Sequence, residues 1–407
     1  MKSFQRIATL ALWASVVALT PAASAQSVIK IGAINPYSGP LALYGNEVTR
    51  GYELAVDQIN AAGGLLGRKV ELVRGDAANA QQGIATVEQL ATRDKVDMFT
   101  GTYVSSISLT ASDAAARYNK LYWETNAIVQ SLVERGLPNF VRTGPTSGNF
   151  AATAVDTVRN LIAPALKKEM KDLKVWLEHE DSIYGTSVAE AQKRMLEAMG
   201  AKVVGVGAHS ARAIDLNDSV LRAKQANPDV LVQTGYVPDG NLLMRTARDQ
   251  GFKPAAMLWV GTGDTAETLE SLGVGSVEGV LVVSYTRPDI VESFGPGAGA
   301  FLKAYREKYK TEPIAPQGMV AYSGMQILFE AIRAAGSVDA EKVRVAAAKM
   351  DKPIGSYPSG WGVKFDKNFT NTRAFMTVVQ WQSGKLVTVF PKNAVNPGAA
   401  LKPLGRS

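Results

Sequence analysis

The sequence predicts an α/β fold of two lobes, each built on a doubly wound parallel sheet. Short apolar runs alternate with longer amphipathic stretches, which is typical of parallel strands joined by right-handed crossover helices. The alternation stops near residue 145 and restarts near residue 174, which gives two similar halves. The 407 residues also exceed what one ordinary core accommodates. Two lobes with a cleft between them are therefore expected.

The first half should supply four strands and three helices. Short apolar runs bounded by turn residues predict strands at residues 28–34, 69–75, 96–100 and 120–125. Helices are expected at residues 41–60, at about 79–94 and from Ser105 onward. Ligands of doubly wound sheets bind beyond the carboxyl ends of the strands, so the loops at 37–45, 101–106 and 126–127 should face the cleft.

The second half continues the strand series and ends in a hairpin. Strands are expected at residues 174–178, 201–207, 229–235, 257–261 and 280–284, with helices between them. A further helix is expected at residues 323–335. Residues 375–381 and 386–390, separated by a polar turn with a glycine, predict a C-terminal β-hairpin.

The loop at residues 101–106 is the first candidate for binding chemistry. It follows an apolar run and leads into a good helix former, with Ser105 and Ser106 at the junction. A helix start offers unpaired backbone N–H groups and the positive end of the helix dipole, which together can hold a carboxylate. The alternative is that Ser105 or Ser106 only caps the helix.

The N-terminus, residues 1–25, reads as a cleavable signal peptide. Lys2 and Arg6 precede an apolar run at 7–19, and Ala23-Ser24-Ala25 is a site that signal peptidase accepts. The apolar run is too short for a membrane span. We therefore expect cleavage near Ala25-Gln26 and export; an ordinary buried N-terminal helix is the alternative.

Composition narrows the class of protein. The sequence has no cysteine, which excludes disulfides, thiol catalysis, Cys-ligated metal sites and a lipid anchor on an N-terminal Cys. An exported chain without such an anchor predicts a soluble periplasmic protein. The net charge of +7 falls to +5 (7 − 2) without Lys2 and Arg6, and the remaining charges are interleaved. No nucleic-acid partner is expected.

Motifs for catalysis, metals or cofactors are weak. His179 and His209 are the only histidines, and the adjacent residues 179–181 do not converge on one ion. No Gly-x-Ser-x-Gly motif frames Ser105 or Ser106, and Gly205-Val206-Gly207 lacks the rest of a dinucleotide motif. No catalytic residue, metal or cofactor is expected. An exported serine hydrolase using Ser105 or Ser106 is the distant alternative.

Several short motifs recur in a known family in the same order. They are Ser38-Gly39-Pro40, Tyr44-Gly45, residues 57–64, Asp76, Ser105-Ser106, Tyr184-Gly185 and Gly235-Tyr236. With them the chain resembles the leucine/isoleucine/valine-binding type of periplasmic binding protein (type I), the soluble receptor of branched-chain amino-acid ABC importers. The resemblance covers nearly the whole mature chain.

The resemblance implies two lobes joined by a three-strand hinge that closes around the ligand. Lobe I would comprise residues 26–145 and 286–358, and lobe II residues 146–285 and 359–407. The partners would be a small-molecule ligand and an inner-membrane ABC permease, and the protein would be a monomer. A sensory module that presents its liganded form to a membrane receptor would use the same fold.

The resemblance also implies a set of ligand-binding residues. They are Ser105 with its neighbour Ser106 for the carboxylate, Thr125, Asn126 and Ala127 in the exit loop of the fourth strand, Tyr44, Tyr184 and Tyr236 as walls, and Asp264 for an ammonium. Val129 stands nearest the place where the family often has a second hydroxyl. Asp264 is displaced by about one position from the place of the family's acidic residue. Asp264 could instead cap a helix at 265–268.

These departures leave the ligand class open. An apolar, branched-chain amino acid is the first choice. An aromatic or other organic acid, or a short amide, is the alternative.

Overall fold

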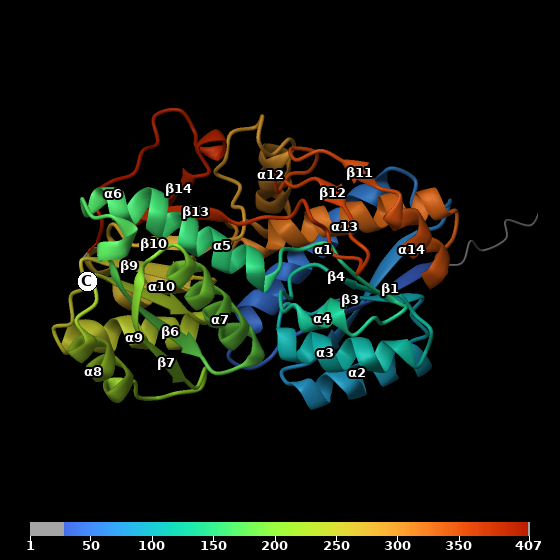
Figure 1. Ribbon diagram of the computed structural model, residues 1–407. Helices are drawn as coiled ribbons and strands as arrows, with labels where there is room; N and C mark the ends of the chain where they lie inside the picture. The colour runs from blue at the N-terminus through green and yellow to red at the C-terminus, as the bar shows by residue number, and fades with distance from the viewer. Residues whose placement is uncertain (1–27, 406–407) are drawn as a thin grey trace, which may run out of the picture.

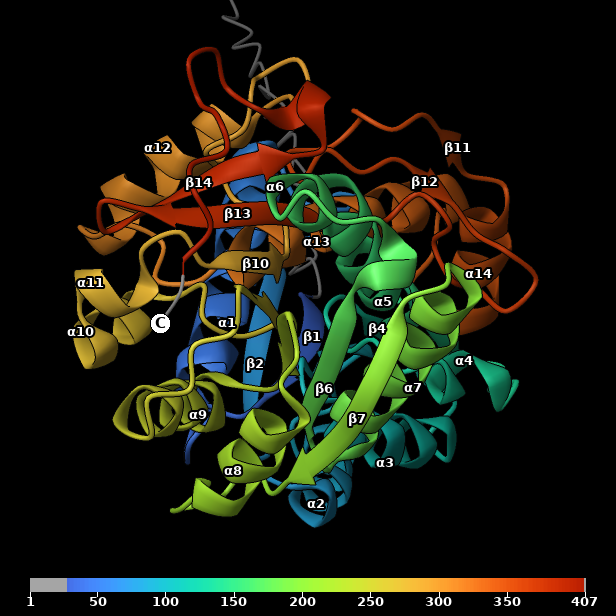
Figure 2. The same cartoon turned by 60° about the vertical axis from the view of Figure 1, so that its left-hand side comes forward.

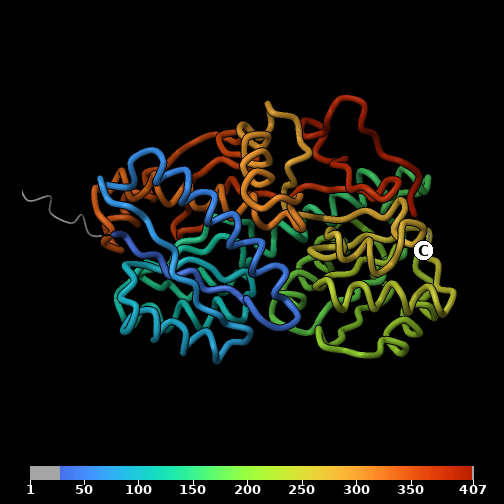
Figure 3. The backbone as a smooth tube through the Cα atoms, turned by 180° about the vertical axis from the view of Figure 1, so that it is seen from behind, coloured from blue at the N-terminus to red at the C-terminus, as the bar shows by residue number. Residues whose placement is uncertain are grey.

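The computed structural model describes residues 28–405 (Figure 1). The predicted signal peptide at residues 1–25, with its cleavage point, lies outside the described residues. Two lobes lie side by side along the long axis of the molecule, each with its own sheet (Figures 1 and 3). The predicted fold class of two doubly wound lobes is confirmed.

The first lobe holds a five-stranded, fully parallel sheet in the order β2-β1-β3-β4-β5. The strands are β1 (Ile29–Asn35), β2 (Val70–Asp76), β3 (Met98–Gly101), β4 (Tyr122–Glu124) and β5 (Phe140–Arg142). The first four match the predicted strands to within a few residues. The short strand β5 was not predicted, because it ends in an arginine that sequence alone assigns to the surface.

Helices cover both faces of this sheet, and several come from the C-terminal part of the chain. They are α1 (Ala42–Ala61), α2 (Ala80–Thr92), α3 (Ser105–Ala116), α4 (Ser131–Glu134), α12 (Ala298–Tyr309), α13 (Gln317–Ala335) and α14 (Ala340–Ala348). Helices α1 and α13 pack together on one face, and α2 and α3 on the other (Figure 1). Helix α13 begins six residues before the predicted start at 323.

The second lobe holds a seven-stranded sheet in the order β14-β13-β10-β9-β8-β6-β7. The strands are β6 (Lys174–Glu180), β7 (Lys202–His209), β8 (Val230–Thr234), β9 (Ala256–Val260), β10 (Leu281–Ser284), β13 (Thr377–Gln382) and β14 (Lys385–Phe390). Strands β6 to β10 are parallel to one another, as expected. The hairpin β13–β14 adds antiparallel strands at one edge.

Helices again lie on both faces of the second sheet. They are α5 (Ser147–Thr157), α6 (Ala163–Ala165), α7 (Ile183–Ala198), α8 (Asn217–Ala226), α9 (Val237–Asp249), α10 (Ala266–Leu272) and α11 (Val274–Val277). Helix α5 packs against α7, while α9 packs against α8 and α10 on the opposite side (Figure 2). Among the described residues, no helix combines the length and hydropathy needed to cross a membrane.

The segment after Pro358 lies against the first lobe before it reaches the second. A small two-stranded sheet pairs β11 (Asp351–Lys352) with β12 (Val363–Lys364). Arg142 exchanges backbone hydrogen bonds with the segment, to the Phe369 carbonyl and from the Asn371 amide, each 2.9 Å long. We therefore propose that the third crossover of the hinge lies near Ala374, some residues beyond the expected boundary at 358.

Candidate ligand-binding site

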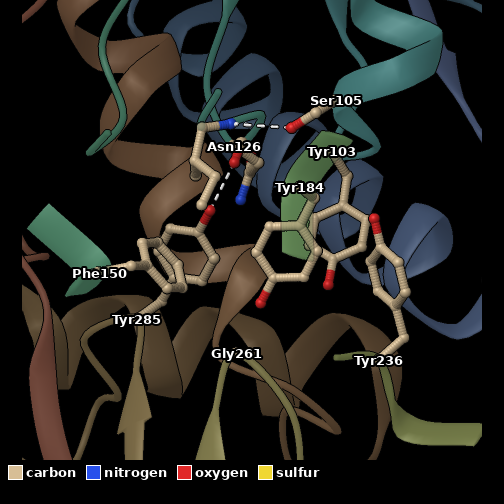
Figure 4. Close-up of a pocket in the computed structure, with 9 residues that line it drawn as sticks. Tyr103, Ser105, Asn126, Phe150, Tyr184, Tyr236, Gly261 and Tyr285 are labelled. Atoms are coloured by element: carbon tan, nitrogen blue, oxygen red, sulfur yellow. Dashed lines mark hydrogen bonds between the residues drawn. The ribbon is translucent and has the colours of Figure 1, made fainter. Parts of the chain in front are cut away.

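A cavity lies between the two lobes, beyond the carboxyl ends of their strands. The space between its lining atoms, counted together with the solvent open to it, is about 270 Å³. Its lining residues are Tyr103, Ser105, Asn126, Ile128, Phe150, Tyr184, Tyr236, Gly261 and Tyr285 (Figure 4). Both sheets contribute to the walls, so a molecule inside would touch both lobes. This is the edge at which ligands of doubly wound sheets bind.

The polar end of the cavity is built from the start of α3. Ser105 is the first residue of α3 and is only 2% exposed. Its Oγ accepts a hydrogen bond of 3.3 Å from the backbone N–H of Ile128 (Figure 4). The first turn of a helix leaves backbone N–H groups unpaired and carries the positive end of the dipole. This end can hold an anionic group.

A buried carboxylate organises the loop after β4. Oε1 of Glu124 accepts the backbone N–H groups of Thr125, Asn126 and Ala127 at 3.0, 2.9 and 2.9 Å. Its Oε2 accepts the Thr102 N–H at 2.7 Å, which ties this loop to the loop before α3. Three of the N–H groups expected to meet a ligand are therefore already satisfied within the protein.

A buried arginine lies behind the same loop. The Arg142 guanidinium is fully buried and donates to the carbonyls of Ile128 and Val129 at 3.0 and 2.7 Å. Burial lowers the pKa of Arg142 to about 10, so it remains a cation at neutral pH. Its charge offsets that of Glu124 and leaves the polar end favourable to an anion.

Aromatic rings form the remaining walls and connect the two lobes. Tyr103 stacks on Tyr44 with ring centroids 4.6 Å apart, and its edge meets Tyr236 of the second lobe at 6.2 Å. Tyr236 contacts Tyr184 at 5.1 Å, and Phe150 contacts Tyr184 at 6.4 Å. Burial raises the pKa of the Tyr103, Tyr184 and Tyr236 phenols well above their ordinary value. All three remain neutral, and the Tyr103 and Tyr236 hydroxyls can donate hydrogen bonds to a ligand.

Two backbone positions shape this aromatic wall. Tyr103 has a φ of +66°, in the left-handed region, which costs a bulky residue about 1–3 kcal/mol and is common at ligand sites. Gly261 has a φ of +68°, and a Cβ there would lie 2.1 Å from the Tyr184 hydroxyl. That hydroxyl donates to the Val260 carbonyl at 3.1 Å. A side chain at position 261 would therefore displace Tyr184 from the wall.

The structure brings only part of the expected residues to the cavity. Ser105, Asn126, Tyr184 and Tyr236 line it. Tyr44 lies behind Tyr103, with its buried hydroxyl unpartnered among the described residues. Ser106, Thr125 and Ala127 do not line the cavity.

Asp264 also lies outside the cavity lining. Its Oδ2 accepts the Ser284 hydroxyl at 2.6 Å, and burial raises the pKa of the Asp264 carboxyl. The alternative role as a helix cap belongs to its neighbour, because Thr265 is the N-cap of α10 and accepts the Thr268 N–H. Asp264 therefore neither lines the cavity nor caps the helix.

Five lining residues were not predicted: Tyr103, Ile128, Phe150, Gly261 and Tyr285. Ile128, not Val129, occupies the wall next to Asn126. Tyr285 and Gly261 directly follow β10 and β9, so the rule of strand ends could have found both. Phe150 lies within a helix, and no local pattern points to it. The Tyr285 hydroxyl donates to the Asn126 carbonyl at 2.5 Å, a contact made across the two lobes (Figure 4).

Known proteins share this architecture over most of the chain. Residues 28–385 match the family model described as periplasmic binding protein. The Leu/Ile/Val-binding protein homolog 7 of Brucella suis biovar 1 is 38% identical over 377 residues, which cover 92% of this chain and 94% of that protein.

Two solved structures show the same fold. The leucine-binding protein LivK of Thermotoga maritima gives a TM-score of 0.77 at 24% identity, covering 91% of this chain and 99% of that one. A solute-binding protein of R. palustris in complex with 4-hydroxybenzoate gives a TM-score of 0.76 at 23% identity. The match covers 93% of this chain and 98% of that one. On this evidence, the chain belongs to the periplasmic binding protein family.

Proposed function

We propose that this chain is the exported substrate-binding protein of an ABC importer and captures a small amphiphilic carboxylate between its two lobes. The observation that carries the proposal is the cavity itself, because one end can hold an anion, the other is aromatic, and both lobes contribute walls. Ser105 and the start of α3 anchor the carboxylate in the first lobe. Tyr184 and Tyr236 engage from the second lobe as the hinge closes, so binding shifts the population toward the closed state.

Membership of the family supports a binding role in the periplasm rather than catalysis. The positions of both histidines agree with this. His179 Nδ1 lies 2.8 Å from the Glu180 carbonyl, and His209 bonds to two carboxylates in the second lobe. Neither is placed to activate Ser105 as a nucleophile, so nothing favours the hydrolase alternative. An inner-membrane permease as partner, a monomeric state and transport rather than sensing are parts of the proposal.

An apolar, branched-chain amino acid is the first candidate ligand. The named relatives support it, since the Brucella protein is called a Leu/Ile/Val-binding protein homolog and the Thermotoga protein a leucine-binding protein. The aromatic and aliphatic walls would bury the apolar side chain.

An aromatic carboxylate is the second candidate, and a specific observation favours it. An α-ammonium needs acceptors, yet the Asn126 carbonyl already accepts the Tyr285 hydroxyl. Asp264 keeps one carboxylate oxygen without a partner among the described residues, but it lies outside the cavity lining. Among the described residues that line the cavity, none carries a carboxylate. A flat ring would stack on the tyrosines without needing an ammonium partner. The R. palustris neighbour with 4-hydroxybenzoate shows that this fold accommodates such a molecule.

A thermal-shift screen tests the proposal and separates the candidates. The mature chain is unfolded, dialysed and refolded to remove any ligand bound during expression. It is then heated with L-leucine, L-isoleucine, L-valine, benzoate, 4-hydroxybenzoate or acetamide. A ligand at 100 times its Kd stabilises the folded state by about 2.7 kcal/mol. Shifts with the amino acids alone support the first candidate, and shifts with the aromatic acids alone the second. No shift with any carboxylate would reject the proposed function.

A further inference from the structure

A histidine bridges two carboxylates inside the second lobe, next to the cavity wall. His209 is the last residue of β7. Its Nδ1 lies 3.0 Å from Oε1 of Glu178 on β6, and its Nε2 lies 3.2 Å from Oδ2 of Asp239 on α9. The three side chains are 2%, 1% and 0% exposed. The Trp176 indole donates to the other oxygen of Glu178 at 2.9 Å. We call Glu178, His209 and Asp239 the buried triad.

Neighbouring glycines make room for the buried triad. A Cβ at Gly207 would lie 2.0 Å from Oε2 of Glu178, and a Cβ at Gly235 would lie 2.1 Å from Oδ2 of Asp239. Any side chain at either position would push a carboxylate away from His209. In the described part of the chain, no group of three His, Asp or Glu side chains is arranged to hold a metal ion. The buried triad is therefore an ion-pair cluster.

The geometry of the contacts favours a charged histidine. Both ring nitrogens of His209 face a carboxyl group, and an ionised carboxylate only accepts hydrogen bonds. With Glu178 and Asp239 both ionised, both ring nitrogens carry a proton. Burial opposes the charged form, but the hydrogen bonds that His209 donates to Asp239 and Glu178 outweigh it and raise the pKa of His209 to about 9. Glu180 is a further acid close enough to Asp239 to repel it. Without the imidazolium, these acids would face one another uncompensated.

Asp239 connects the buried triad to the ligand site. Its second oxygen accepts the backbone N–H of Tyr236 at 3.0 Å, at the start of α9. The Tyr236 carbonyl in turn accepts the Thr262 hydroxyl at 2.7 Å. Tyr236 carries the ring that meets Tyr103 of the other lobe. The orientation of Tyr236 in the wall thus depends on Asp239, whose other carboxylate oxygen is hydrogen-bonded to His209.

We propose that His209, as an imidazolium, is a positioning residue for the ligand site: it fixes Asp239, which holds Tyr236 in the wall that closes on the ligand. Ligand affinity then depends on the charge of a side chain that does not line the cavity. The effect on affinity rests on the proposed function, whereas the charge state of the buried triad does not.

The first experiment therefore needs no ligand. The His179→Gln variant leaves His209 as the only histidine in the sequence. Its side-chain ¹H–¹⁵N spectrum should show both ring nitrogens protonated at pH 7.5, with titration centred near pH 9. A neutral ring at pH 7.5 would overturn the proposal, whatever the outcome of the ligand screen.

The second experiment measures affinity from pH 7 to pH 10. Benzoate is the main probe because it does not titrate in this range, and L-isoleucine is compared between variants at equal pH. Burial holds the Tyr236 phenol neutral throughout, since its pKa is raised well above the ordinary value. The wild-type protein should lose about tenfold in affinity as the pH passes 9, and His179→Gln should follow the same profile.

The His209→Gln variant should bind about tenfold more weakly at pH 7 and lose the alkaline fall. Wild-type affinity and an unchanged pH profile in this variant would overturn the proposal. The wild-type profile decides the matter if His209→Gln fails to fold, because a flat profile up to pH 10 also contradicts the proposal. If neither probe binds at pH 7, the proposed function and its effect on affinity fall together, and the spectrum alone judges the buried triad.

Discussion

Replacing Ser105 with alanine should weaken ligand binding far more than it weakens the fold. In the free protein the change removes one neutral hydrogen bond, the 3.3 Å contact from Ile128 N–H to Oγ. Such a bond contributes about 0.5–1.5 kcal/mol, and its length places it at the lower end. With a carboxylate ligand, the same hydroxyl would make a charge-assisted bond of about 1.5–3 kcal/mol. Kd should therefore rise about 10- to 150-fold.

Ser106→Ala is the matched control. Ser106 belongs to the same first turn of α3 but does not line the cavity. Isothermal titration with L-isoleucine and with benzoate at pH 7 measures affinity, and thermal melting without ligand measures stability. We expect a near wild-type Kd for Ser106→Ala. An unchanged Kd in Ser105→Ala would remove Ser105 from the site, and equal losses in both variants would assign the effect to α3 as a whole.

Three further substitutions test other parts of the structure. Tyr285→Phe frees the Asn126 carbonyl, so titrations should show L-isoleucine affinity rising relative to benzoate; an unchanged ratio contradicts this. Burial raises the pKa of Glu47 to about 7, so its stabilisation is complete below the unfolded pKa near 4.5 and disappears as pH rises through 7. Between pH 5 and pH 8, the free energy of unfolding should therefore fall by up to about 3 kcal/mol less in Glu47→Gln than in the wild-type protein. Melting temperatures measured across this range check it, and parallel curves for the two proteins refute it. Glu124→Gln places an amide N–H₂ opposite the Thr102 N–H, so two donors face each other. The free energy of unfolding, measured with urea, should therefore fall by about 2–4 kcal/mol. A fall below about 0.5 kcal/mol contradicts this.

The alternating architecture was readable from sequence because its physical cause is local. Strands buried on both faces need continuous apolar runs, and residues 96–100 and 280–284 show them clearly. Strand β5 was missed because it is three residues long and ends in Arg142, whose burial depends on carbonyls in a distant loop. Helices α12 and α14 were missed as well, although both cover the first lobe from the far end of the chain.

The sequence by itself also predicted three residues that line the cavity, Ser105, Tyr184 and Tyr236. Ser105 stands where an apolar strand gives way to a helix, and Tyr184 and Tyr236 follow strands in the same way, so local rules place them at one edge. Only the tertiary structure decided which groups remain free for a ligand. Glu124 accepts the backbone N–H groups of its own loop, and one oxygen of Asp264 accepts the Ser284 hydroxyl. Such pairings join residues on different elements, and they form only when packing brings those elements within hydrogen-bonding distance.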